Sequence, residues 1–69
     1  MTKFEYCVFQ VVYPTNKSEI LFPNGEIKDT SNEHVIGVLN KLGKEEWELV
    51  STKIFDVAGI FYFKRELNE

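Results

Sequence analysis

Residues able to perform covalent chemistry are few and scattered in this sequence. Cys7 is the single cysteine and His34 the single histidine. Nucleophilic catalysis needs a thiol or hydroxyl beside a base, but Cys7 lies within a run of strand-forming residues, where a small core residue is expected. His34 falls in the expected first turn of a helix, and nothing there marks it as a catalytic base. We therefore predict no catalytic residues and expect that the protein is not an enzyme.

The remaining polar clusters do not form a metal or cofactor site. Structural zinc takes four ligands at close, paired spacings, and one cysteine with one histidine cannot supply them. The glutamates at 45, 46 and 48 follow Lys44 and indicate a solvated turn rather than paired acid–base carboxylates. The glycines are isolated, so no phosphate-binding loop is present (Gly25, Gly37, Gly43 and Gly59). We predict no metal and no cofactor.

Aromatic and cationic side chains meet in the run Tyr62-Phe63-Lys64-Arg65. Aromatic rings stack on planar ligands and arginine pairs with phosphate, so this run could hold a nucleotide-like metabolite in a cleft between subunits. Lys53 on the expected neighbouring strand would join it. The candidate ligand-binding residues are Lys53, Tyr62, Lys64 and Arg65. The simpler interpretation is a strand with a solvated, charged end.

The first expected element is a strand over residues 4–13, because this segment is dense in β-branched and aromatic residues and stops at Pro14. Both faces of the strand are largely apolar, whereas a sheet with one wet side alternates apolar and polar residues. We therefore expect this strand to be covered on both faces. Asn24-Gly25 then predicts a tight turn, with 20–22 and 26–28 paired as a small hairpin; an irregular loop is the alternative.

A helix is expected over residues 31–42. Thr30 and Glu33 fit a capping box, with Ser31 as a competing N-cap. An apolar stripe follows at helical spacing (Val35, Ile36, Val38, Leu39 and Leu42). Gly43 is expected to end the helix in the left-handed conformation, and Trp47 to close the helix end over the sheet.

Strands are expected over 47–55 and 60–65, joined by a tight turn, with frayed residues at 66–69. In the first of these strands, alternation places Val50, Thr52 and Ile54 on one face and Leu49, Ser51, Lys53 and Phe55 on the other. The predicted fold is α+β in the order β-α-β-β. It has a three-stranded, mainly antiparallel sheet in the order 1-3-2, one helix on one face and the small hairpin at 20–28. If the first strand pairs with the second instead, that pair is parallel and a right-handed crossover applies.

Length and charge limit the function classes. The 69 residues are expected to form a single domain, 1–69. A net charge of −3 argues against DNA or RNA binding, which favours a basic surface. No apolar run could span a bilayer, and the first residues do not resemble a signal peptide. One unpaired cysteine suits a reducing, cytoplasmic location.

Self-association is expected because a single helix covers only one face of such a sheet, while aromatic residues lie on both. Leaving several rings exposed would forgo a few kcal/mol at about 25 cal/mol per Å². Symmetric homo-oligomers are the common remedy. The candidate interface residues are Tyr6, Phe9, Phe61 and Phe63 on the strands and Asn24 at the hairpin tip.

Several segments resemble an uncharacterised domain family of small bacterial and phage proteins. That family begins Trp-Glu-Tyr-Lys-Val-Val, continues through Leu-Asn-Glu-Leu-Gly and Glu-Gly-Trp-Glu-Leu-Val, and closes on Tyr-Phe-Lys-Arg. The corresponding residues here are Glu5-Tyr6, Leu39-Asn40, Leu42-Gly43, Glu45, Trp47-Glu48-Leu49-Val50 and Tyr62-Phe63-Lys64-Arg65. Phe4 replaces the family tryptophan and Glu46 replaces a glycine, so a positive φ at 46 would be strained or absent. The resemblance implies a fold and no activity.

Two functional hypotheses follow from the sequence. The first is a non-enzymatic, homo-oligomeric module that acts through protein–protein interaction, by its uncovered sheet face or the Asn24-Gly25 hairpin. The second is a small-ligand protein that binds or sequesters a nucleotide-like metabolite between subunits. In a phage-encoded protein, such sequestration would counter host nucleotide signalling.

Overall fold

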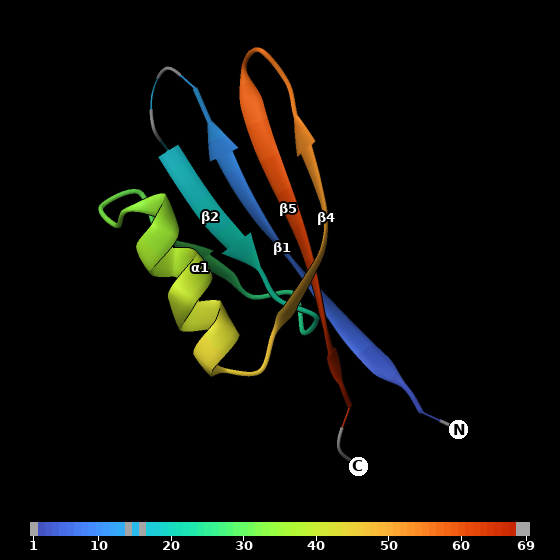
Figure 1. The fold of residues 1–69 in the computed structure, drawn as a ribbon. Helices are drawn as coiled ribbons and strands as arrows, with labels where there is room; N and C mark the ends of the chain where they lie inside the picture. Colours follow the sequence, from blue (N-terminus) through green and yellow to red (C-terminus); the bar gives the residue numbers. More distant parts are fainter. Residues whose placement is uncertain (1, 14, 16, 68–69) are drawn as a thin grey trace.

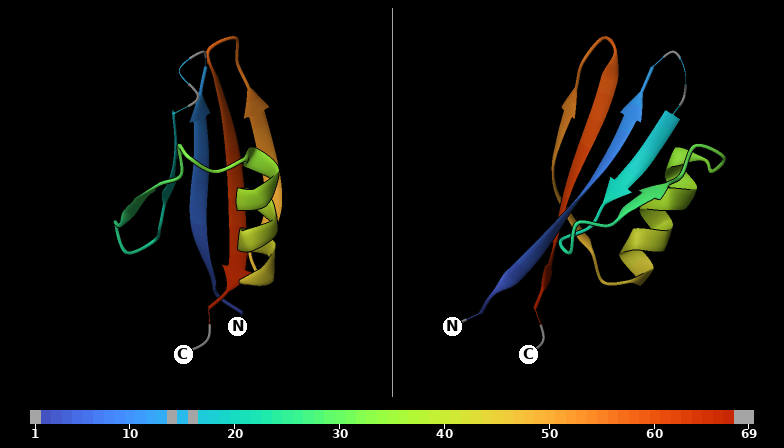
Figure 2. Two further views of the ribbon diagram at one scale, coloured as in Figure 1. Left: turned by 90° about the vertical axis from the view of Figure 1, so that its left-hand side faces the viewer. Right: turned by 180° about the vertical axis from the view of Figure 1, so that it is seen from behind.

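The computed structural model describes residues 2–13, 15 and 17–67 as five antiparallel strands and one helix. The sheet order is β3-β2-β1-β5-β4 (Figure 1). The elements are β1 (Phe4–Val12), β2 (Lys17–Leu21), β3 (Ile27–Asp29), α1 (Val35–Lys44), β4 (Glu48–Ile54) and β5 (Ala58–Glu66). Figure 2 shows α1 on one face of the twisted sheet, and no described element lies on the other face. Pro14, expected to end the first strand, lies outside the described residues.

The predicted 1-3-2 order is confirmed as β1-β5-β4, with both pairs antiparallel. The predicted strand count of three is wrong, because the small hairpin forms as β2 and β3 and joins the same sheet through β1. The first residues of β2 are polar, so the sequence pattern did not indicate that this strand would extend the sheet. Ser18 of β2 is buried on the helix side, where its Oγ lies 2.6 Å from Thr30 Oγ1. The two buried hydroxyls satisfy each other by a hydrogen bond. A polar pair therefore occupies a position where the pattern of a half-buried strand would have an apolar residue.

The core lies between α1 and the side of the sheet that carries Cys7, Phe9 and Val11 from β1. Ile20 of β2, Phe63 of β5 and Trp47 after the helix complete its strand and loop side, and Val38 and Leu42 come from the helix. The alternation expected for residues 49–55 is wrong at one point. Leu49 lies opposite Phe63 but Ser51 lies opposite Tyr62, so Val50 forms a bulge and Leu49 shares the helix side with Thr52 and Ile54.

The helix begins four residues later than expected, at Val35, with His34 as the N-cap and no side-chain cap. The predicted capping box is wrong, because both candidate caps have other partners. Thr30 is buried against Ser18, and Ser31 Oγ donates to Asp29 Oδ1 at 2.6 Å. Glu33 instead pairs with Lys41 Nζ at 3.0 Å. The residues before α1 therefore attach the loop to β2 rather than starting the helix.

The helix ends in a Schellman motif with glutamate at the left-handed position. Gly43 was expected there, but α1 continues through Lys44, and Glu46 has φ 70°. The N–H of Trp47 donates to Leu42 O, and the N–H of Glu46 donates to Gly43 O, both at 3.0 Å. This is the hydrogen-bond pair of the motif, in which the left-handed residue is most often glycine.

We expect Glu46→Gly to stabilise the protein by about 1 kcal/mol, because glycine removes the Cβ strain of the left-handed conformation. Urea unfolding followed by circular dichroism would measure the change. The matched control is Glu45→Gly at the neighbouring C-cap, where φ is −90° and strain relief is not available. Equal effects of the two glycines would contradict the explanation.

The chain end is also more ordered than expected over its described part. Glu66 belongs to β5, and Leu67 N donates to Lys3 O at 2.8 Å. The expectation of fraying is therefore wrong for these two residues, and residues 68 and 69 lie outside the described part.

Candidate functional site

One uncovered surface is the side of the sheet away from α1, which we call the open face. Cys7, Phe9 and Val11 line the core, so the alternating residues of β1 point the other way. Residues directly opposite in neighbouring strands share a face, and the register therefore assigns the rest. The open face comprises Phe4, Tyr6, Val8, Gln10, Val12, Lys17, Glu19, Leu21, Ile27, Asp29, Glu48, Ser51, Lys53, Ala58, Ile60, Tyr62, Lys64 and Glu66.

One row of the open face is almost wholly apolar across all five strands. The pairings place Ile27, Leu21, Val8, Tyr62 and Ser51 side by side. Tyr6, two residues before Val8 on the same side of β1, is 59% exposed. Phe4 is also exposed, and Lys64 Nζ lies 4.6 Å from the centroid of the Phe4 ring. A contiguous apolar surface of this kind usually marks a binding site for a partner.

The neighbouring row carries opposite charges at its two ends. The pairings align Asp29, Glu19, Gln10, Ile60 and Lys53 from β3 to β4. The acidic side chains therefore lie near one edge of the sheet and the lysine at the other. Glu19 lies directly opposite Asp29, and like charges so placed repel each other. This arrangement leaves two carboxylates that a cation would stabilise.

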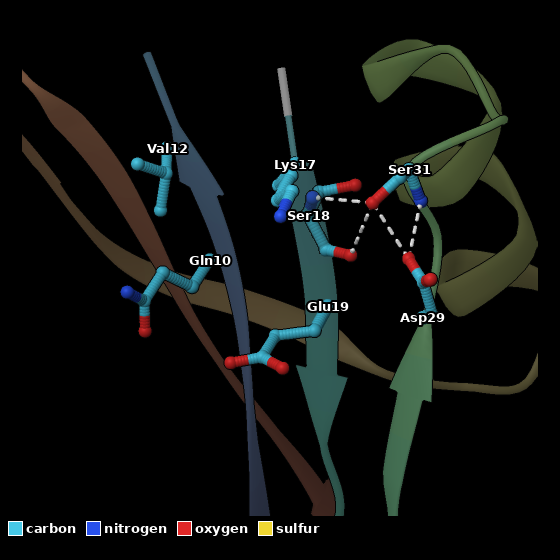
Figure 3. Close-up of a pocket in the computed structure, with 7 residues that line it drawn as sticks. All are labelled: Gln10, Val12, Lys17, Ser18, Glu19, Asp29 and Ser31. Atoms are coloured by element: carbon cyan, nitrogen blue, oxygen red, sulfur yellow. Dashed lines mark hydrogen bonds between the residues drawn. The ribbon is translucent and has the colours of Figure 1, made fainter. Parts of the chain in front are cut away.

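A hollow of about 500 Å³ lies at the acidic end of this row (Figure 3). Asp29 Oδ1 accepts hydrogen bonds from Ser31 N at 2.9 Å and from Ser31 Oγ at 2.6 Å. These bonds lower the pKa of Asp29, so its carboxylate stays charged. The hollow is lined by Gln10, Val12, Lys17, Ser18, Glu19, Asp29 and Ser31.

The structure separates the four predicted ligand-binding residues. Lys53, Tyr62 and Lys64 lie on the open face, but Arg65 lies on the helix side, opposite Glu5. Consecutive residues of a strand point to opposite faces, so Lys64 and Arg65 cannot contact one ligand as a pair. The structure therefore corrects the inclusion of Arg65 among the ligand-binding residues. The alternation of side chains along a strand already indicated that Lys64 and Arg65 point to opposite faces.

Arg65 instead fastens the end of the helix to the sheet. Its Nε donates to Glu5 Oε2 at 3.0 Å, and Nη1 donates to the carbonyl of Glu45 at 3.1 Å. The guanidinium lies 4.2 Å from the centroid of the Trp47 ring. The indole is buried at the C-terminal end of α1, as expected from the sequence. Arg65 therefore links β1, the end of α1 and Trp47.

The predicted interface residues also divide between the two faces. Tyr6 is exposed on the open face, and Asn24 is exposed at the hairpin tip, where its Oδ1 accepts from Glu26 N at 3.0 Å. Phe9 and Phe63 are core residues, and Phe61 stacks on Phe9 with ring centroids 5.4 Å apart. Phe9 and Phe63 belong to the core and Phe61 packs against it, which corrects the assignment of these three residues to an interface.

The single cysteine lies in the core of the described structure. Cys7 is buried, and burial raises the pKa of its thiol to about 11, so it is a poor nucleophile near neutral pH. Within residues 2–13, 15 and 17–67, no group of three or more His, Cys, Asp or Glu side chains could hold a metal ion. The one described helix is too short to cross a membrane.

Comparisons of the chain with protein-family models, curated proteins and solved structures give no match. The resemblance to the uncharacterised bacterial and phage family therefore stays a prediction. The geometry of the open face is the basis for the proposals that follow.

Proposed function

We propose that this protein is a non-enzymatic interaction module that self-associates through its open face. The observation that carries the proposal is the apolar row that crosses the whole sheet beside the exposed rings of Phe4 and Tyr6. Water contact with this surface costs free energy that a second copy would recover. The lone buried thiol of Cys7 suits a reducing compartment such as the cytoplasm.

The open face reaches the smallest area expected of a specific interface. Strands β1 and β5 have nine residues each, β4 has seven, β2 has five and β3 has three. At roughly 3.3 Å per residue and about 4.8 Å between strands, each copy contributes on the order of 500 Å². The combined area of about 1,000 Å² is the minimum for a biological protein–protein interface.

Tyr6→Asp should abolish self-association while leaving the protomer folded. The charge would be buried without a partner in the interface, whereas the exposed tyrosine contributes little to the core of one copy. Sedimentation velocity over a concentration series is expected to show at least a 100-fold rise in the dissociation constant. Ile36→Asp is the matched control, because Ile36 is 65% exposed on α1, away from the open face.

Three results would decide the proposal, the third from the same sedimentation measurement with a nucleotide added. A wild-type protein that stays monomeric at every concentration would overturn it. Equal weakening by Tyr6→Asp and Ile36→Asp would place the interface elsewhere. Dissociation of the wild-type oligomer by a nucleotide would favour the alternative function, ligand sequestration. That alternative retains Lys53, Tyr62 and Lys64 on the open face but has lost Arg65 to the Glu5 and Trp47 contacts.

A further inference from the structure

Building on the proposed self-association, we infer that two copies pack open face to open face about a twofold axis along β1. In this arrangement the partner's Lys53 enters the hollow beside Asp29 and Glu19. Two observations carry the inference: the opposite charges at the two ends of one row, and the position of the acidic hollow on the face that must be covered.

Two copies of the charged row attract each other only when the acidic end of one row faces the lysine end of the other. Asp29 lies on the edge strand β3 and Glu19 on β2, whereas Lys53 lies on the opposite edge strand β4. Strand β1 is the middle strand of the sheet. A twofold axis along β1 therefore lays the β3 edge of each copy over the β4 edge of the other. Both charge pairs then form by symmetry.

The other simple packing is disfavoured by the same charges. A twofold axis across the strands would lay each β3 edge over the β3 edge of the partner and leave the acidic groups facing each other. Like-charge contact across an interface is a strong penalty against the wrong arrangement. Aligned packing, with strand directions within about 30°, is also a common geometry for two stacked sheets.

The hollow provides what a lysine side chain requires. An ammonium group donates up to three hydrogen bonds, and the residues that line the hollow include the acidic Glu19 and Asp29 and the amide-bearing Gln10. Lys17 is the single cation in its lining, so these groups leave one net negative charge for the partner's Lys53 to neutralise. Lys64 is not a competitor, because its Nζ lies 3.7 Å from Glu48 Oε2.

Charge exchange tests this arrangement directly. Lys53→Glu is one variant, and Glu19→Lys combined with Asp29→Asn is the other; the asparagine oxygen can still accept the bonds that Asp29 accepts from Ser31. Each variant alone is expected to self-associate at least 10-fold more weakly than wild type, because like charges then meet. An equimolar mixture is expected to form a heterodimer, since both contacts in the mixed pair join opposite charges. Native mass spectrometry and sedimentation would measure both, with circular dichroism to confirm folding.

The outcomes separate this inference from the proposed function. A wild-type dimer that both variants leave intact would overturn the arrangement while self-association stands. Two weakened variants that fail to form a heterodimer would also overturn it, because the lysine and the acidic groups would then not meet. A monomeric wild type, by contrast, would contradict the proposed function itself.

Discussion

Phe9→Ala is expected to leave the protein largely unfolded at about 25 °C. Phe9 is fully buried in the central strand β1, where it stacks on Phe61 and belongs to the core beneath α1. Truncation of a buried phenylalanine costs about 3–5 kcal/mol, through lost burial and the cavity that remains. A core of this size rarely supplies more than about 3–5 kcal/mol in total. Circular dichroism and urea titration would measure the loss.

The matched control is Phe55→Ala, in which the same atoms are removed from a side chain that is 52% exposed. We expect a loss below about 1 kcal/mol, since surface truncations away from the core have small effects. Both substitutions belong in a Tyr6→Asp background, where association should not add to the measured stability. Similar losses for Phe9 and Phe55 would show that the core is not where the structure places it.

Trp47→Ala is expected to cost a similar amount, about 3–5 kcal/mol, because the indole is buried among core residues. It also removes the ring over which the Arg65 guanidinium lies. Urea unfolding of Trp47→Ala, Arg65→Ala and the double variant would form a mutant cycle. We expect a coupling of about 0.5–2 kcal/mol, the size of a partly desolvated cation–π contact.

Trp47→Phe serves as the comparison for this cycle. Phenylalanine keeps an aromatic face for Arg65, and it removes an indole N–H that has no hydrogen-bond partner among the described residues. Its loss of stability should therefore be clearly smaller than that of Trp47→Ala. Additive effects of the tryptophan and arginine substitutions would exclude the stacking contact as a contributor to stability.

Local patterns predicted β1, β4 and β5 because those signals lie within each segment, whereas the order of these strands was favoured because antiparallel pairs are the commoner kind. The aromatic and β-branched runs of β1 and β5 are legible on their own, and Asn24-Gly25 marks the hairpin turn. The Thr30 capping signal failed because its hydroxyl met Ser18, which lies 12 residues earlier in the chain. A contact at that separation has no local signature. The same limit explains the misplaced start of the helix.

The candidate site was only partly predictable for a related reason. The excess of aromatic residues on two faces indicated an uncovered sheet surface, and the structure locates such a surface on the open face. Which rings occupy it depends on the placement of α1, so Phe9, Phe61 and Phe63 were misassigned. The charged row joins β3, β2, β1, β5 and β4, and no sequence window contains it. It became visible only through the strand register.

The position of β5 beside β1 constrains when the protein can fold. Phe4 pairs with Glu66, so the middle of the sheet joins residues that are almost the full described length apart. Closing so long a loop is entropically costly, and folds dominated by distant pairings form slowly. During synthesis on the ribosome, β1 could not pair with β5 until Ala58 and the residues after it had emerged. Until then, β1 would keep one unpaired edge, and unpaired strand edges are what make incompletely folded chains prone to aggregate.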